Sequence, residues 1–122
     1  MMRMLANGIT ALVAVIHVYI LVLEMFLWTK PAGRRAFNTT EAFARDSQVL
    51  AANQGLYNGF LAAGLAWGLS LGDNGYGIRL FFLCCVTVAG VMGAVTASRK
   101  ILYVQALPAA IAIVFTYLSS HQ

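Results

Sequence analysis

Residues 10–28, TALVAVIHVYILVLEMFLW, decide how this chain can fold. The run is long enough to cross a lipid bilayer as one helix, because a spanning helix needs about 20 mostly apolar residues. It nevertheless contains His17 and Glu24. A carboxylate near the hydrocarbon core costs roughly 2.5–3.5 kcal/mol on insertion scales, so an ionisable residue at this depth is a candidate functional residue.

The composition of the whole chain also indicates an integral membrane protein. Of its 122 residues, 61% are hydrophobic and 10% are charged, and its mean hydropathy is +0.78. This length predicts a single transmembrane domain over residues 1–122. The net charge of +4 is explained by topology signals and by contacts with lipid headgroups. We therefore expect membrane lipids as partners and no nucleic acid.

Four apolar runs of similar length follow one another along the chain. They cover residues 9–28, 49–71, 78–98 and 101–119. None shows the strict alternation of barrel strands, so each is predicted to be a helix. The polar segment 29–48 contains a turn signal at residues 30–33 and a candidate interfacial helix at 40–45. Short connections make consecutive helices antiparallel neighbours, and the predicted fold is an all-α, up-down, four-helix membrane bundle.

The basic residues predict the orientation of the bundle. With four spans, one side carries Lys30, Arg34, Arg35, Arg45, Arg99 and Lys100. The other side carries only Arg3 and Arg79. Because cations accumulate in cytoplasmic loops, we expect the first and third loops in the cytoplasm and both termini outside, in the periplasm, for a multi-pass protein of the cell inner membrane.

Polar side chains from three predicted helices fall at one level of the membrane. With a rise of about 1.5 Å per residue, Asn53, Gln54 and Gln105 lie within about one turn of the depth of Glu24. Polar groups inside a bundle should face one another or a water-filled cavity. The predicted ligand-binding residues are Asn53, Gln54, Tyr57, Asn58, Tyr103, Gln105 and Arg99.

The favoured hypothesis is a polar pocket in the cytoplasmic half that holds a small amphipathic or lipid-like ligand. If the pocket carries out acid–base or conjugation chemistry, Glu24 is the candidate general acid or base and His17 a second proton donor or acceptor. Arg99 or Lys100 would hold an anionic headgroup. The sequence predicts no particular cofactor. A metal site is not expected, since His17 and Glu24 lie about 10.5 Å apart along the helix axis.

Two other functions are compatible with the same residues. Thr10, His17 and Glu24 are spaced seven residues apart, so they share one helix face and could form a path for protons or small solutes. Asn and Gln also act as hydrogen-bonding glue between membrane helices, which would make this a structural subunit.

Small residues and a proline mark the expected helix contacts. Gly55 with Gly59, and Gly64 with Gly68, form two GxxxG pairs that let helices approach closely. Their spread over several faces predicts packing within the bundle and between subunits, in a homo-oligomer such as a dimer or trimer. Pro108 is expected to kink the last helix just beyond Gln105.

Four stretches resemble a family of small bacterial integral membrane proteins of unknown function. They are HVYI at 17–20, LEMFLW at 23–28, NQGLYNGF at 53–60 and QALP at 105–108. This resemblance implies a four-helix bundle and no known activity.

A looser resemblance is to the membrane-associated eicosanoid and glutathione metabolism proteins, which are trimers of four-helix subunits. Residues 34–41, RRAFNTTE, are similar to that family's Arg-Ala, Asn, Glu signature. The spacing from Ala36 to Asn38 is one residue shorter, and the third helix has no Arg-Tyr motif.

Overall fold

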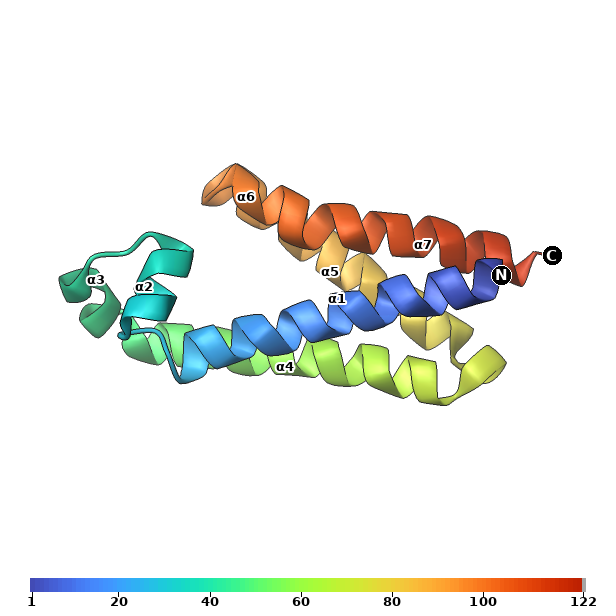
Figure 1. The fold of residues 1–122 in the computed structure, drawn as a ribbon, viewed down its shortest axis with the longest axis horizontal. Coiled ribbons are helices and arrows are strands. Elements are labelled where there is room, and N and C mark those ends of the chain that lie inside the picture. Colours follow the sequence, from blue (N-terminus) through green and yellow to red (C-terminus); the bar gives the residue numbers. More distant parts are fainter. Residues whose placement is uncertain (122) are drawn as a thin grey trace. The chain divides into compact units, whose positions relative to one another are not determined.

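The computed structural model describes residues 1–121, which contain helices and no strand. Figure 1 shows their order along the chain. The elements are α1 (Met2–Met25), α2 (Pro31–Phe37), α3 (Glu41–Asp46), α4 (Gln48–Ser70), the 3₁₀ turn η1 (Gly72–Gly75), α5 (Tyr76–Thr96), α6 (Arg99–Ile101), the π-helical turn η2 (Leu102–Ala106) and α7 (Leu107–Ser120). The all-α prediction is confirmed.

Within residues 1–121, three helical stretches are long and apolar enough to cross a membrane. They are Met2–Met25, Gly72–Thr96 and Arg99–Ser120. These stretches support an integral membrane protein. Helix α4 is of similar length, but Asn53, Gln54 and Asn58 interrupt its apolar residues. The count of four spans, the inner-membrane location and the orientation of the termini stay predictions.

The segment between α1 and α4 contains two short helices, one of them at the predicted position. Pro31 occupies the first turn of α2, where its missing N–H is not needed. Thr40 caps α3, because its side-chain oxygen accepts a hydrogen bond of 3.1 Å from the Phe43 amide. The Trp28 indole N–H donates to Ser47 Oγ over 3.0 Å, which ties the start of this segment to its end.

The contacts divide the chain into two compact units. The first comprises Met1–Ile16 together with residues 61–121, and the second comprises His17–Phe60. The apolar core of the first unit consists of Val13, Leu65, Leu83, Val86, Ala109 and Ala112. In this unit the N-terminus and the end of α7 lie at the same end (Figure 1). The single-domain organisation of residues 1–122 stays a prediction.

Glycines allow close helix contacts inside each unit, as their spacing predicts. A Cβ atom on Gly90 of α5 would lie 2.6 Å from the backbone nitrogen of Ala106 and 2.8 Å from its Cβ. A Cβ atom on Gly64 would overlap the ring of Phe82. The contact at Ala106 is the tighter constraint, because backbone atoms cannot move aside as a side chain can. Packing between subunits, in a dimer or trimer, stays a prediction.

The irregular start of the last helix lies where Pro108 predicts a disturbance. Proline has no N–H to donate to the carbonyl four residues earlier. The π-helical turn Leu102–Ala106 directly precedes α7, and Pro108 lies in the first turn of α7. A proline in the first turn of a helix breaks no hydrogen bond that the helix would otherwise make.

We predict that Gly90→Ala destabilises the protein by about 1–3 kcal/mol, because the added methyl group overpacks the contact with Ala106. The measurement is thermal unfolding of the detergent-solubilised protein. Gly77→Ala is the matched control, since a Cβ on Gly77 of the same helix meets nothing within 4 Å. Equal stability of the two variants would contradict the close packing at Gly90.

Candidate functional site

The side chains of Glu24 and Asn58 meet between α1 and α4, inside the second unit. The Asn58 side-chain amide donates a hydrogen bond of 2.6 Å to Glu24 Oε1. Both residues are buried, with Glu24 3% and Asn58 8% exposed. A buried carboxyl group with an amide partner matches the expectation that an acidic residue within an apolar helix faces a polar group on another helix.

Two glycines on α4 bring that helix close enough for the contact. A Cβ on Gly55 would lie 2.6 Å from Met25 Cγ and 3.1 Å from Glu24 Cβ. A Cβ on Gly59 would lie 2.7 Å from Leu21 Cδ1. Residues 55, 58 and 59 share one helix face. The GxxxG pair therefore packs against α1, and this close approach places Asn58 within hydrogen-bonding distance of Glu24.

Three other predicted site residues lie near the start of α4. Asn53, Gln54 and Tyr57 are exposed in the structure. Asn53 and Gln54 were predicted from their depth in the membrane, and depth along the helix axis does not determine which face of α4 meets α1. Their role as ligand-binding residues stays a prediction. The GxxxG pair on either side of Asn58 was the sequence signal for that face.

Two other polar residues of α1 lie on the same helix face as Glu24. His17 and Thr10 are fully buried, and the Thr10 hydroxyl donates to the Ala6 carbonyl over 2.8 Å. A stripe of three buried polar residues thus runs along one face of α1, as its spacing of seven residues predicts.

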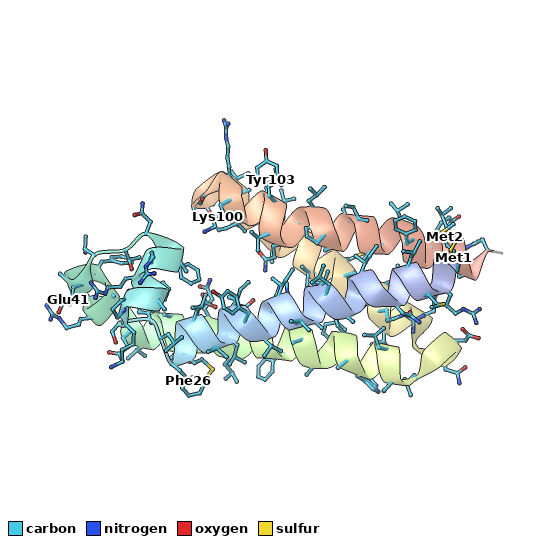
Figure 2. The ribbon with its side chains drawn as sticks, viewed as in Figure 1. Met1, Met2, Phe26, Glu41, Lys100 and Tyr103 are labelled. Carbon is cyan, nitrogen blue, oxygen red and sulfur yellow. The ribbon has the colours of Figure 1, made fainter. Side chains whose placement is uncertain are left out.

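Three predicted site residues belong to the first unit. Tyr103 is exposed and its ring projects away from the helix (Figure 2). Gln105 is half-buried and Arg99 is exposed. Because Glu24 and Asn58 belong to the second unit, the convergence of these three residues on Glu24 stays a prediction.

The chemistry available at the described site is that of a carboxyl group and an amide. The ionised carboxylate only accepts hydrogen bonds, whereas the protonated acid can also donate one. The Asn58 N–H group can serve either form. Among residues 1–121, no group of three or more His, Cys, Asp or Glu side chains is placed to hold a metal ion.

These features define a small helical integral membrane protein with a buried carboxyl–amide pair. The chain belongs to the family described as protein of unknown function (DUF1304), whose profile matches residues 11–117. It is also similar to the uncharacterized protein YpaA of Lactococcus lactis subsp. lactis (strain IL1403). The two are 30% identical over 118 residues, which cover 95% of this chain and 99% of YpaA.

No solved structure matches the chain. The predicted membership of a family of unknown function is confirmed. The looser resemblance to the eicosanoid and glutathione metabolism proteins stays a prediction.

Replacing Asn58 with alanine should destabilise the protein by about 1–3 kcal/mol, because the buried Glu24 carboxyl loses its hydrogen-bond donor. Unfolding with increasing denaturing detergent, followed by tryptophan fluorescence, measures the change. Asn53→Ala removes an exposed amide from the same helix and should change stability little. The assigned contact is wrong if both variants unfold at the same detergent concentration.

Proposed function

We propose that this protein binds a small amphipathic or lipid-like molecule within the membrane, with the polar end of the molecule at Glu24. The observation that supports the proposal is the buried hydrogen bond between Glu24 and Asn58, in a helix with the length and apolarity of a membrane span.

An energetic comparison favours a role beyond helix cohesion. Polar contacts between membrane helices contribute about 0.6 kcal/mol on average. Placing an acidic side chain in the apolar region costs roughly 2.5–3.5 kcal/mol. One hydrogen bond from Asn58 therefore does not offset the cost of Glu24, and a purely cohesive role would be met more favourably by an amide at position 24.

The proposal also includes chemistry at this position. Glu24 would act as a general acid or base towards the bound molecule, with Asn58 holding the carboxyl group in one orientation. His17 lies seven residues before Glu24 on the same face of α1. It would be a second proton donor or acceptor. The class of reaction, acid–base or conjugation, depends on the ligand.

Glu24→Gln tests the proposal, because the new amide keeps an oxygen that can accept the Asn58 hydrogen bond but cannot exchange a proton. We expect wild-type protein, gently extracted from its membrane, to carry a small bound molecule detectable by native mass spectrometry. The bound fraction should fall on the order of tenfold in the variant, as expected for a lost hydrogen bond to a charged group, with thermal stability retained.

Glu41→Gln is the matched control, since Glu41 is an exposed carboxylate paired with Arg45 over 3.3 Å. It should retain the bound molecule. The ligand-binding proposal is overturned by a wild-type protein that carries nothing, or by a Glu24→Gln protein that carries as much as wild type.

Proton transport is a second candidate, favoured by the buried stripe of Thr10, His17 and Glu24 on α1. Side chains that bind and release protons at successive depths are the elements of a proton relay. Such a relay would move protons along the helix without requiring a large pocket.

We expect His17→Gln to abolish proton flux into liposomes if the relay operates, since glutamine cannot be protonated near neutral pH. A pH-sensitive dye inside the vesicles measures the flux under an imposed potential. His121→Gln, which changes an exposed histidine near the end of α7, should leave the flux unchanged. Equal flux in protein-free liposomes and in those with wild-type protein would rule out the relay.

A further inference from the structure

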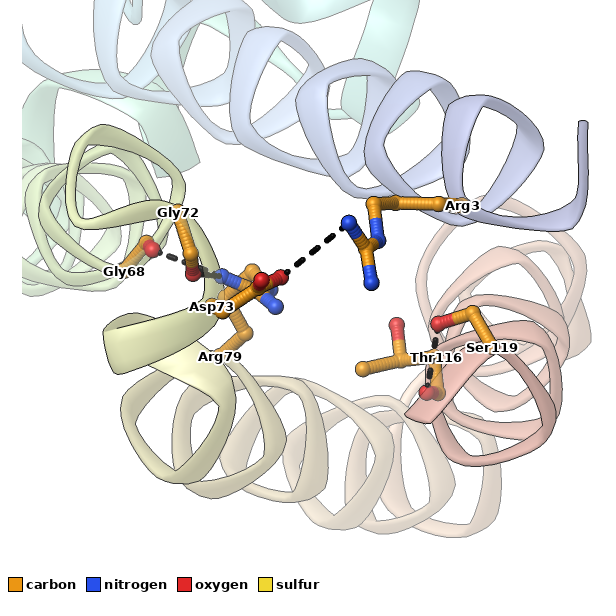
Figure 3. Close-up of polar contacts among 7 residues, drawn as sticks. All are labelled: Arg3, Gly68, Gly72, Asp73, Arg79, Thr116 and Ser119. Atoms are coloured by element: carbon orange, nitrogen blue, oxygen red, sulfur yellow. Dashed lines mark hydrogen bonds and ion pairs between the residues drawn. The ribbon is translucent and has the colours of Figure 1, made fainter. Parts of the chain in front are cut away.

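A polar cavity of about 360 Å³ opens at one end of the first unit. It is lined by Arg3, Asp73, Tyr76, Arg79, Ser119 and Ser120. All six belong to the first unit, so the cavity is separate from the Glu24–Asn58 pair. Figure 3 shows Arg3 reaching from α1 towards Asp73, with Ser119 on the opposite side.

Arg79 is the buried cation of this cavity, with 7% of its surface exposed. Its Nη1 donates to the carbonyl of Gly68 over 2.8 Å and to that of Gly72 over 2.6 Å. These bonds reach one carbonyl in the last turn of α4, where carbonyls lack a partner within the helix, and one at the start of η1. Arg79 Nε is also buried but has no hydrogen-bond partner among residues 1–121.

The bonds to Gly68 and Gly72 involve Nη1 and do not use the other edge of the guanidinium group, which is formed by Nε and Nη2. The Nε–Nη2 edge presents parallel N–H donors that match two oxygens of a phosphate or carboxylate group. A buried cation whose Nε donor is unsatisfied incurs a desolvation cost that an anion would remove. Arg79 therefore supplies both the charge and the geometry for an anion.

Arg3 supplies a second, adaptable cation. Its ion pair with Asp73 is 3.5 Å long, and the side chains of Arg3 and Asp73 are 62% and 76% exposed. Exposed ion pairs of this kind contribute little to stability, so Arg3 can exchange Asp73 for a ligand at small cost. Asp73 is the only carboxylate among the lining residues, against two guanidinium groups.

The hydroxyl groups on α7 add neutral polar partners. Ser119 Oγ donates to the Thr116 carbonyl over 2.8 Å, so its oxygen remains available as an acceptor. Thr116 Oγ1 is buried and has no hydrogen-bond partner among the described residues. Thr116 lies beside Ser119 on the side of the cavity that faces Arg3 (Figure 3).

The cavity lies at the ends of the three candidate spans. Arg3 is in the first turn of α1, Arg79 in the first turn of α5, and Ser119 in the last turn of α7. The ends of membrane-spanning helices lie at the level of the lipid headgroups. A phosphate group is the abundant anion at this level, and basic pockets between membrane helices bind such groups.

We propose that this cavity is a phosphate-binding site, in which Arg79 and Arg3 hold the phosphate group of a phospholipid headgroup or of a free phosphate ion. The oxygens would accept hydrogen bonds from the Nε–Nη2 edge of Arg79 and from Arg3 after it leaves Asp73. This site is independent of the function proposed for Glu24.

Binding to the full-length protein in neutral detergent tests the site, with the shift in melting temperature as the readout. One arm titrates inorganic phosphate against chloride at equal ionic strength. The other compares phosphatidic acid with diacylglycerol of the same acyl chains, which lacks only the phosphate group. A shift with phosphatidic acid alone identifies a lipid headgroup as the ligand, and a saturable shift with inorganic phosphate identifies the free ion.

Variants of the exposed ion pair then connect binding to the cavity. Arg3→Ala should weaken phosphate affinity about fivefold, through loss of one charge-assisted hydrogen bond. Asp73→Asn should strengthen it about threefold, because it removes a competing carboxylate. Arg79 stays unchanged in these tests, since its bonds to Gly68 and Gly72 support the fold.

Arg45→Ala is the matched control for Arg3→Ala. Arg45 is 64% exposed and pairs with Glu41 over 3.3 Å, much as Arg3 pairs with Asp73, but it lies in the second unit. The proposal is overturned if neither probe shifts the melting temperature, or if Arg3→Ala and Arg45→Ala weaken binding equally. Loss of ligand from Glu24→Gln protein has no bearing on these outcomes.

Discussion

A carboxyl group that is buried away from water needs a hydrogen-bond partner. In this chain the Asn58 side-chain amide donates that hydrogen bond to Glu24. The bond of 2.6 Å joins residues 34 positions apart in the sequence. It therefore fixes how far α1 and α4 slide along each other within the second unit. Gly55 and Gly59 favour the same register, because a Cβ at either position would lie within 2.7 Å of a side-chain atom of α1 and that side chain would have to move. The polar contact and the glycine contacts thus specify one arrangement of the two helices.

In the first unit, the hydrogen-bond partners of a buried ionisable side chain are backbone carbonyls. Arg79 is a buried cation, and its Nη1 donors meet the carbonyls of Gly68 and Gly72. The absence of a side chain at Gly68 is necessary here, since a Cβ would lie 2.6 Å from Arg79 Cγ. Gly72 also adopts a positive φ of 58°, which glycine tolerates without strain. Each unit therefore pairs one buried ionisable side chain with glycines on α4 or in the turn after it.

The sequence predicted the helices well because the length of an apolar run is a direct physical requirement for crossing a membrane. It predicted the start of α1 less well: the helix begins at Met2 rather than Ile9, since the preceding residues are mostly good helix formers. It selected Glu24, which is buried and bonded to Asn58, but which amide of α4 meets it depended on the helix face, and its functional role stays a prediction. Arg79 bonds to backbone carbonyls, which every residue has. No sequence pattern could therefore predict its contacts with Gly68 and Gly72.

The polar residues of α4 show why a purely structural explanation of this helix is incomplete. One face, with Gly55, Asn58 and Gly59, is fully used by α1. Asn53 and Gln54 are exposed, and the hydrogen bond of Glu24 comes from Asn58, so Glu24 does not account for them. The predicted placement of α4 as a fourth span would put these amides in an apolar environment, where they would require water, a ligand or a second protein surface, because an unsatisfied polar group there costs several kcal/mol. The contact of α4 with α1 uses only the amide of Asn58. The exposed amides of Asn53 and Gln54 are the physical reason to look for a bound partner beside this helix.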